Sequence, residues 1–148
     1  MMMKQGDYMI YRLYRKDPED MVTEFFLPDD DMKHKVRRLA SLASYKKEGY
    51  QVFGIMYVDK ECYLNARLTH TVQDYLYMDN QEEDTRRKYH SGEIDKEVAL
   101  QTLEMIQDHK WTLLKVLSHQ VDRLVHNDFS VENEIALQLY DQYVKAML

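Results

Sequence analysis

The chain has 148 residues, a formal net charge of −6 at pH 7 and one cysteine, Cys62. A chain of this length can bury a core without disulfides or a structural metal, and a lone cysteine excludes a disulfide framework and a thiolate zinc site. No stretch approaches the roughly 18 apolar residues of a membrane span, and the opening MMMKQGDYMI lacks the apolar core of a signal peptide. We therefore expect a single domain, residues 1–148, in the cytoplasm and without a membrane partner.

The charge is unevenly distributed along the chain. Residues 1–60 carry 11 Lys and Arg against 10 Asp and Glu, whereas residues 61–148 carry 9 against 16. An acidic chain is unfavourable for general nucleic-acid binding, although a local basic patch stays open. The 12 tyrosines and 10 methionines are typical either of a protein-contact surface or of an irregularly packed core.

The pattern of residues 1–59 predicts a ββαβ unit with a small three-stranded sheet. DYMIYRLYRK and MVTEFFL alternate and are separated by a proline-containing turn, which favours a β-hairpin. The segment after Pro28 has acids at its start, lysines at its end and an apolar stripe at helical spacing, made of Met32, Val36, Leu39 and Ala43. YQVFGIMYV is nearly continuous in apolar residues, so we expect a third strand in the centre of the sheet.

Residues 60–148 are predicted to be mostly helical, which makes the whole chain an α+β protein. The spacing of Leu64, Leu68 and Val72 favours a helix from about residue 61 to residue 89, although ECYLNARLT also alternates and could pair as a strand. A long helix is expected from about residue 93 to residue 126, and Ser130 is expected to cap a last helix.

The segment HKWTLLKVLSHQVDRLVHND, residues 109–128, concentrates histidines and invites a metal-site interpretation. On a helix, His119 and His126 lie opposite the apolar face, among charged residues of alternating sign. Seven residues separate them by about 10 Å along the axis, too far for both to reach one ion. We therefore expect solvated histidines, with no metal and no cofactor.

Lys110 falls near the centre of the apolar arc of the same predicted helix. A buried charge is costly unless it is paired or reaches water, so three structural explanations are open. The helix breaks near residues 108–110, the side chain extends to water, or a carboxylate from another segment meets it. A functional lysine with a depressed pKa is the alternative.

Catalytic patterns are weak. Asp29–Asp31 stand at a helix start, where carboxylates interact favourably with the positive end of the helix dipole. Residues 82–84 are predicted to form charge pairs along a helix. Asp29, Asp59 and Lys60 could serve a nuclease, but no further acid has a convincing spacing. Glu93, Glu97, Glu104 and Asp108 could hold a metal for a hydrolase, although such spacing is common on solvated helices.

Two candidate contact surfaces follow from these patterns. The basic residues Lys33, Arg37 and Arg38 project away from the apolar stripe of their helix and could contact nucleic acid or a partner protein. A protein interface is the other hypothesis, with large aromatic side chains as its candidates, namely Tyr8, Tyr11, Tyr14 and Trp111.

We expect a small, non-catalytic protein-interaction or regulatory protein that binds a protein partner or itself, as a homo-oligomer. The first alternative is a nucleic-acid-associated regulator that uses the basic helix. The second alternative is a metal-dependent phosphate-ester or nucleotide hydrolase that uses helical carboxylates.

Overall fold

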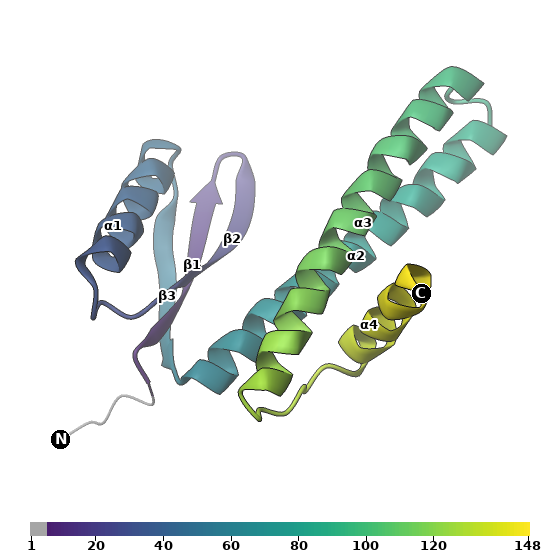
Figure 1. Ribbon diagram of the computed structural model, residues 1–148. Helices are drawn as coiled ribbons and strands as arrows, with labels where there is room; N and C mark the ends of the chain where they lie inside the picture. The colour runs from purple at the N-terminus through teal and green to yellow at the C-terminus, as the bar shows by residue number, and fades with distance from the viewer. Residues whose placement is uncertain (1–5) are drawn as a thin grey trace. The chain divides into compact units, whose positions relative to one another are not determined.

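The computed structural model describes residues 6–148 and has the predicted α+β architecture, a three-stranded antiparallel sheet with one helix followed by three further helices (Figure 1). In chain order the elements are β1 (Tyr8–Lys16), β2 (Glu19–Phe26), α1 (Met32–Lys47), β3 (Gln51–Val58), α2 (Lys60–His90), α3 (Lys96–His126) and α4 (Glu134–Met147). The chain divides into two compact units, the first ending at Tyr63 and the second covering Leu64–Leu148. That the whole chain is one domain stays a prediction.

The sheet of the first unit has the strand order β2-β1-β3, with both pairs antiparallel. The central strand is therefore β1, and the prediction that residues 50–58 form a central strand is wrong. The hairpin partner β2 occupies one edge of β1, and β3 returns after α1 to the other. Tyr11 shows the register, because it faces Glu24 of β2 and Ile55 of β3.

One face of this sheet carries the core of the first unit. Residues of alternate positions in β1 point to this face and are buried together with one residue of β2 and the residue just before β3, namely Met9, Tyr11, Leu13, Phe26 and Tyr50. Leu42 and Tyr45 of α1 pack against this cluster. On the opposite face, Tyr8 and Phe25 pack against the ring of Tyr63, with centroids 4.8 and 5.9 Å away.

Helix α1 begins and ends as its sequence predicts. The side of the helix that faces the sheet, however, is not the predicted apolar stripe. The carboxylate of Asp31 accepts a hydrogen bond from the Lys33 amide at 2.9 Å and caps the helix. The chain leaves α1 through Gly49, whose φ of +92° is a conformation that suits glycine. The side turned to the sheet is the one with Leu42 and Tyr45, so the predicted apolar stripe faces outward.

In the second unit, α2 and α3 form a helical hairpin. Its buried seam comes from apolar residues at helical spacing, namely Leu64, Leu68, Val72, Tyr75, Ala99, Ile106, Leu114, Leu117, Val121 and Leu124. Residues 61–68 are helical, so the predicted helix is confirmed and the strand alternative is wrong. Helix α3 begins three residues later than about residue 93, because Asp95 caps it by accepting from the Val98 amide at 2.8 Å.

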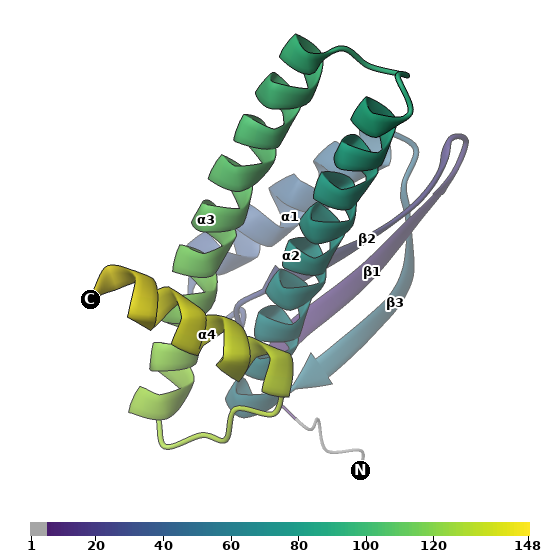
Figure 2. The ribbon, with the colours of Figure 1, turned by 90° about the vertical axis from the view of Figure 1, so that its right-hand side faces the viewer.

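Helix α4 runs across the part of this hairpin that is remote from the α2–α3 turn (Figure 2). Its cap is Asn133, whose side chain accepts from the Ala136 amide, so the expected cap at Ser130 is wrong. The Tyr143 ring packs against Trp111 of α3 at 5.2 Å. Among residues 6–148, no helix combines the length and the apolar character that crossing a membrane requires.

Candidate functional site

The outer edge of β3 is the most unusual surface of the first unit. Among residues 6–148 no strand pairs with this edge, so β3 presents a row of backbone amides and carbonyls that the sheet does not use. Its sequence, QVFGIMYV, contains no charged residue and no proline. The side chains of Phe53 and Met56 are 69% and 55% exposed, an unusual degree of exposure for apolar residues in a strand.

The opposite edge of the same sheet is protected. Strand β2 carries Glu19, Asp20 and Glu24 in its eight residues. Charged side chains on an edge strand discourage pairing with another chain, because desolvating them is costly. The two edges therefore differ in kind, since β2 carries charged side chains and β3 carries none.

The side chains of α1 form hydrogen bonds with β1 and β2. Helix α1 is tied towards β2, because the Tyr45 hydroxyl donates a hydrogen bond to Glu24. Burial, and then the bond to Glu24, raise the pKa of Tyr45, so this phenol stays protonated as a donor. Tyr50, just before β3, likewise donates to Asp20 of β2, and that bond raises its pKa. The first bond ties α1 to β2, and the second ties the residue before β3 to β2.

The outward apolar stripe of α1 adds to the uncovered apolar area of this unit. Met32, Val36 and Leu39 are all more than half exposed, with Met32 at 70%. The helix can tolerate this orientation because its inward side supplies Leu42 and Tyr45 to the core. The stripe is therefore a second apolar surface beside the sheet.

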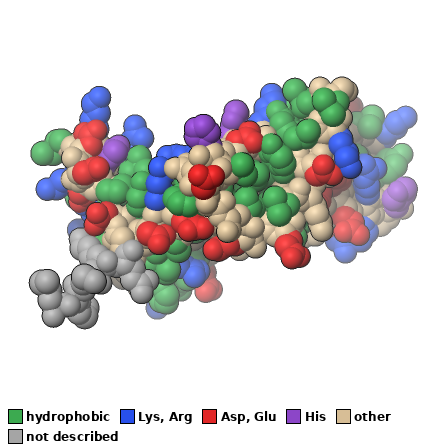
Figure 3. Space-filling model, turned by 60° about the horizontal axis from the view of Figure 1, so that its bottom comes forward, with side chains coloured by type: hydrophobic (Ala, Val, Ile, Leu, Met, Phe, Trp, Pro, Cys, Tyr) green, Lys and Arg blue, Asp and Glu red, His purple; other side chains and the backbone are tan. Residues whose placement is uncertain are grey.

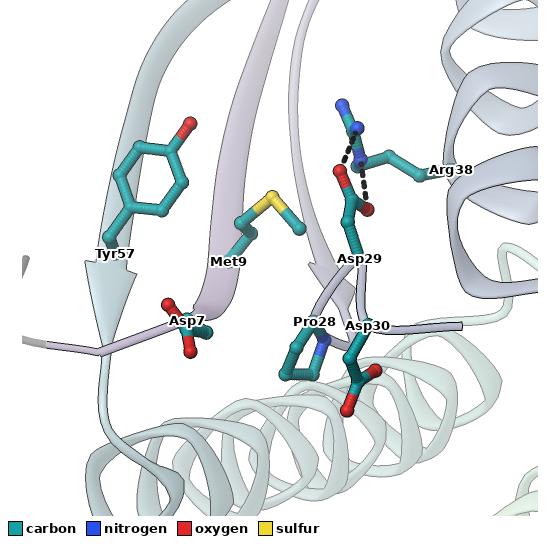
Figure 4. Close-up of a pocket in the computed structure, with 7 residues that line it drawn as sticks. All are labelled: Asp7, Met9, Pro28, Asp29, Asp30, Arg38 and Tyr57. Atoms are coloured by element: carbon teal, nitrogen blue, oxygen red, sulfur yellow. Dashed lines mark hydrogen bonds and ion pairs between the residues drawn. The ribbon is translucent and has the colours of Figure 1, made fainter. Parts of the chain in front are cut away.

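A cavity of about 340 Å³ lies near the end of β3 (Figure 4). Its lining comes from β1, β3, α1 and the connections next to them, namely Asp7, Met9, Pro28, Asp29, Asp30, Arg38 and Tyr57. Arg38 donates to Asp29 through Nη2 at 2.6 Å and through Nε at 3.3 Å, and to the Tyr11 hydroxyl at 3.2 Å. The bond to Asp29 is the main cause of a raised pKa at Arg38.

The charge of this cavity is therefore partly compensated. Arg38 neutralises Asp29, and Asp30 lies 3.5 Å from the ring nitrogen of His34, a contact that is ionic only when the histidine is protonated. Asp7 lies on the β1 side of the cavity, away from the Arg38–Asp29 pair (Figure 4). The net negative character suits a basic side chain of a partner better than an anion.

The predicted basic surface is divided by the structure. Lys33 and Arg37 are exposed, whereas Arg38 turns towards the sheet and is bound to Asp29. The three residues therefore do not form one surface that could follow a nucleic-acid backbone. On the face shown in Figure 3, acidic and basic side chains are interspersed with hydrophobic ones rather than separated by sign.

The predicted aromatic interface is dispersed as well. Tyr11 is a core residue with 4% exposure and contacts Phe26 edge-on, so it cannot reach a partner. Tyr8 packs on Tyr63, and Tyr14 is half-buried. Trp111 lies in the other unit, where it contacts Tyr143 and remains 36% exposed.

Lys110 pairs with carboxylates of another segment. This is the third of the structural explanations that the sequence left open for a lysine on the apolar side of the helix. Its ammonium donates to Glu82 at 3.0 Å and pairs with Asp79, both on α2, and it lies 5.0 Å from the centre of the Tyr75 ring. Burial lowers the pKa of Lys110, but the bonds to Asp79 and Glu82 raise it, and the net shift is upward. The alternative of a functional lysine with a depressed pKa is therefore wrong.

The remaining chemical candidates have structural partners. Asp31 caps α1, and Asp59 accepts from the Cys62 amide at 2.8 Å at the start of α2. Asp84 pairs with Arg87 and Lys88 along α2. His119 and His126 are exposed, as predicted. Within residues 6–148, no three His, Cys, Asp or Glu side chains lie together in a way that could hold a metal ion.

The uncovered row on β3 was missed because its apolar content was attributed to burial. The available signal was the absence of any charge over eight residues, which buried central strands and unprotected edge strands share. No protein-family model, curated protein or solved structure matches the chain. Its function must therefore be argued from the geometry.

Proposed function

We propose that this protein is a non-catalytic protein-interaction protein that self-associates by pairing β3 with β3 of a second copy. The observation that carries this proposal is the uncharged, exposed edge strand in a sheet whose other edge is charged. Strand addition at an open edge is a common mode of protein recognition, because the main-chain hydrogen bonds supply affinity.

A second copy is the occupant that this strand suits best. Two copies of β3 related by a two-fold axis run antiparallel, so each strand offers the other an equivalent row of donors and acceptors. No charge on either strand opposes the approach. The resulting six-stranded sheet has β2 at both ends, where Glu19, Asp20 and Glu24 discourage further strands. Assembly therefore stops at a dimer.

The test is a substitution in the middle of β3. A two-fold axis at the middle of β3 places Ile55 close to its own copy, so Ile55→Lys brings two positive charges together and we expect the dimer dissociation constant to rise about tenfold or more. Ile135→Lys is the matched control, because Ile135 on α4 is 43% exposed and Ile55 is 42% exposed. Multi-angle light scattering and sedimentation velocity over a range of concentrations measure the dimer dissociation constant of each variant.

Two further arms make the result specific to β3 pairing. Mixing Ile55→Lys with Ile55→Glu should restore a heterodimer, because opposite charges then meet at the two-fold axis. Raising the salt should leave the wild-type dimer intact or strengthen it, since two copies of charge −6 repel each other less. A strictly monomeric wild type, or equal loss in Ile135→Lys, contradicts the proposal.

The two other functions gain no support from the geometry. Nucleic-acid binding would rest on Lys33, Arg37 and Arg38 acting together, and Arg38 is engaged with Asp29. Metal-dependent hydrolysis would rest on helical acids, and no metal-holding group occurs among the described residues. We therefore propose neither.

A further inference from the structure

Helix α1 combines a strongly basic composition with an outward apolar stripe. Its 16 residues include six Lys and Arg residues and no Asp or Glu, in a chain whose formal net charge is −6. Five of the six basic side chains are exposed, namely Lys33, Lys35, Arg37, Lys46 and Lys47. Because charges across an interface are complementary, a partner of this helix carries negative charge.

The exposed basic residues stand on both sides of the apolar stripe. Residues spaced by four, three and four positions form the stripe, namely Met32, Val36, Leu39 and Ala43. At about 100° per residue, Lys33 and Arg37 fall on one side of it. Lys35 and Lys46 fall on the other side. The result is an apolar strip bordered by positive charge along the helix, whose length is about 24 Å at 1.5 Å per residue.

These positive charges are not used within the described part of the chain. Within residues 6–148, the ion pairs of α1 are those of His34 with Asp30 and of Arg38 with Asp29. The five exposed basic side chains form no ion pair there. The inner side of α1 already packs on the core of the first unit, so a partner can cover the outer side without displacing the helix.

An apolar stripe with basic borders is typical of a helix that lies in the surface of a membrane. Such a helix turns its apolar side towards the acyl chains, while Lys and Arg contact anionic head groups. The flexible stems of these residues let the charges stay at the level of the head groups. A nucleic-acid backbone, in contrast, would place phosphates against the apolar stripe and gain nothing from it. An anionic bilayer offers charge on both sides of the helix and an apolar layer beneath it.

We propose that α1 binds the surface of a membrane that contains anionic lipids, with its apolar stripe towards the acyl chains and its five exposed basic residues among the head groups. This contact uses α1 alone and does not depend on pairing through β3. The expectation of no membrane partner was based on the lack of an apolar span, which a helix lying on the surface does not need.

The experiment is co-sedimentation of the full chain with vesicles of two compositions. One is phosphatidylcholine alone, and the other is phosphatidylcholine mixed in equal parts with phosphatidylserine. At low salt, we expect the partition coefficient to be about tenfold higher or more for the mixed vesicles, because only these carry the charge that the basic residues meet. Raising the salt should weaken the binding, since it screens exposed charges.

A pair of substitutions tests the basic borders. Lys33→Gln combined with Lys35→Gln removes one charge from each side of the stripe and should lower the partition coefficient about tenfold or more. Both lysines stand near the start of α1, where positive charge does not stabilise a helix. The matched control is Lys96→Gln combined with Lys115→Gln, which removes two exposed positive charges from α3 and should change the coefficient less than about threefold.

A second pair tests the apolar stripe at constant charge. Val36→Ser combined with Leu39→Gln should lower the partition coefficient about tenfold, since both side chains lose their contact with the acyl region. Ser and Gln resemble Val and Leu in helix propensity, so α1 is retained. The matched control is Val125→Ser combined with Leu100→Gln on α3, where the exposed fractions are 60% and 57% against 57% and 51% in α1. This control should bind as the wild type does.

Several results would overturn the proposal. They are the absence of wild-type binding to the mixed vesicles, equal binding to both compositions, equal losses in the α1 and α3 variants, and a loss with the lysine pair but not with Val36 and Leu39. Wild-type protein that ignores the vesicles but binds polyglutamate or duplex DNA would assign the helix to an acidic protein or to nucleic acid instead. Circular dichroism checks the fold of each variant, and the wild-type comparison alone decides the matter if the variants do not fold.

Discussion

Lys110 shows how one residue can join two helices. Its side chain is 12% exposed and lies between Asp79 and Glu82 of α2, and Gln107 of α3 also donates to Glu82 at 2.7 Å. A buried ion pair adds little net stability compared with apolar packing, but removing one member leaves the other without compensation. Lys110 therefore helps to set the register of α2 against α3, and its removal would leave Asp79 and Glu82 without their shared cation.

Lys110→Met should lower the free energy of unfolding by about 1–3 kcal/mol at pH 7, because Glu82 would lose a buried charged partner. Urea denaturation measures this change. Lys145→Met is the control, since Lys145 and Asp141 form an exposed pair, for which we expect a loss of about 0.5 kcal/mol or less.

The same pair predicts a pH dependence. Lys110 holds the pKa of Glu82 below its ordinary value of 4.5, so the pair contributes fully above that pH. Its contribution is lost as the pH falls through the lowered pKa of folded Glu82. The stability difference between wild type and Lys110→Met should therefore shrink steadily below about pH 4.5. A difference that stays constant down to pH 2 would show that Glu82 is not the partner that matters.

At the scale of elements, Asn65 holds the connection between α3 and α4. It is 4% exposed, donates to the Ser130 carbonyl at 3.0 Å and accepts from the Glu132 amide at 3.0 Å. The connection precedes the Asn133 cap, so these bonds place the start of α4. No sequence pattern signalled this role, because a polar residue inside an apolar helix period looks like an exception.

Asn65→Ala should destabilise the second unit by about 1–3 kcal/mol, since two backbone groups of the connection lose their partner. The same substitution should also accelerate hydrogen exchange at the Glu132 amide. Asn80→Ala, at an exposed position of the same helix, is the control and should leave both quantities nearly unchanged. Unchanged exchange at Glu132 in Asn65→Ala would contradict this account of the connection.

The helices were predictable from sequence and the exposure of β3 was not, for a physical reason. Apolar periodicity reports which residues of a helix can share a buried side, and Leu64, Leu68 and Val72 are buried as their spacing predicts. In a strand, apolar content does not distinguish burial by neighbours from exposure at an edge. The position of β3 follows from strand order, which depends on pairings between distant segments.

The candidate sites were less predictable still. Lys33, Arg37 and Arg38 are close in sequence, but the partner of Arg38 is Asp29, nine residues away and outside the helix. The apolar stripe of α1 is visible in the sequence, but its outward direction follows from the packing of the other side of the helix on the sheet. Sequence spacing can place residues on one side of a helix, but it cannot identify what faces them.

At the scale of the whole molecule, the asymmetry between the sheet edges determines the expected assembly. An uncharged edge at β3 and an acidic edge at β2 allow one pairing and discourage a second. The outward stripe of α1 lies on the face of the sheet that α1 covers, and a two-fold axis perpendicular to the sheet places both copies of that stripe on the same face. The dimer would therefore present a wider apolar surface than either copy alone.

Hydrogen exchange of the individual β3 amides, followed as the protein concentration is raised, tests the central claim most directly. The β3 amides that point away from β1 should exchange rapidly in dilute protein and become protected in concentrated protein. The outward amides of β2 should exchange rapidly at both concentrations, because that edge stays unpaired. Outward β3 amides that exchange equally fast at every concentration, in a sample that scattering shows to be dimeric, would contradict pairing through β3.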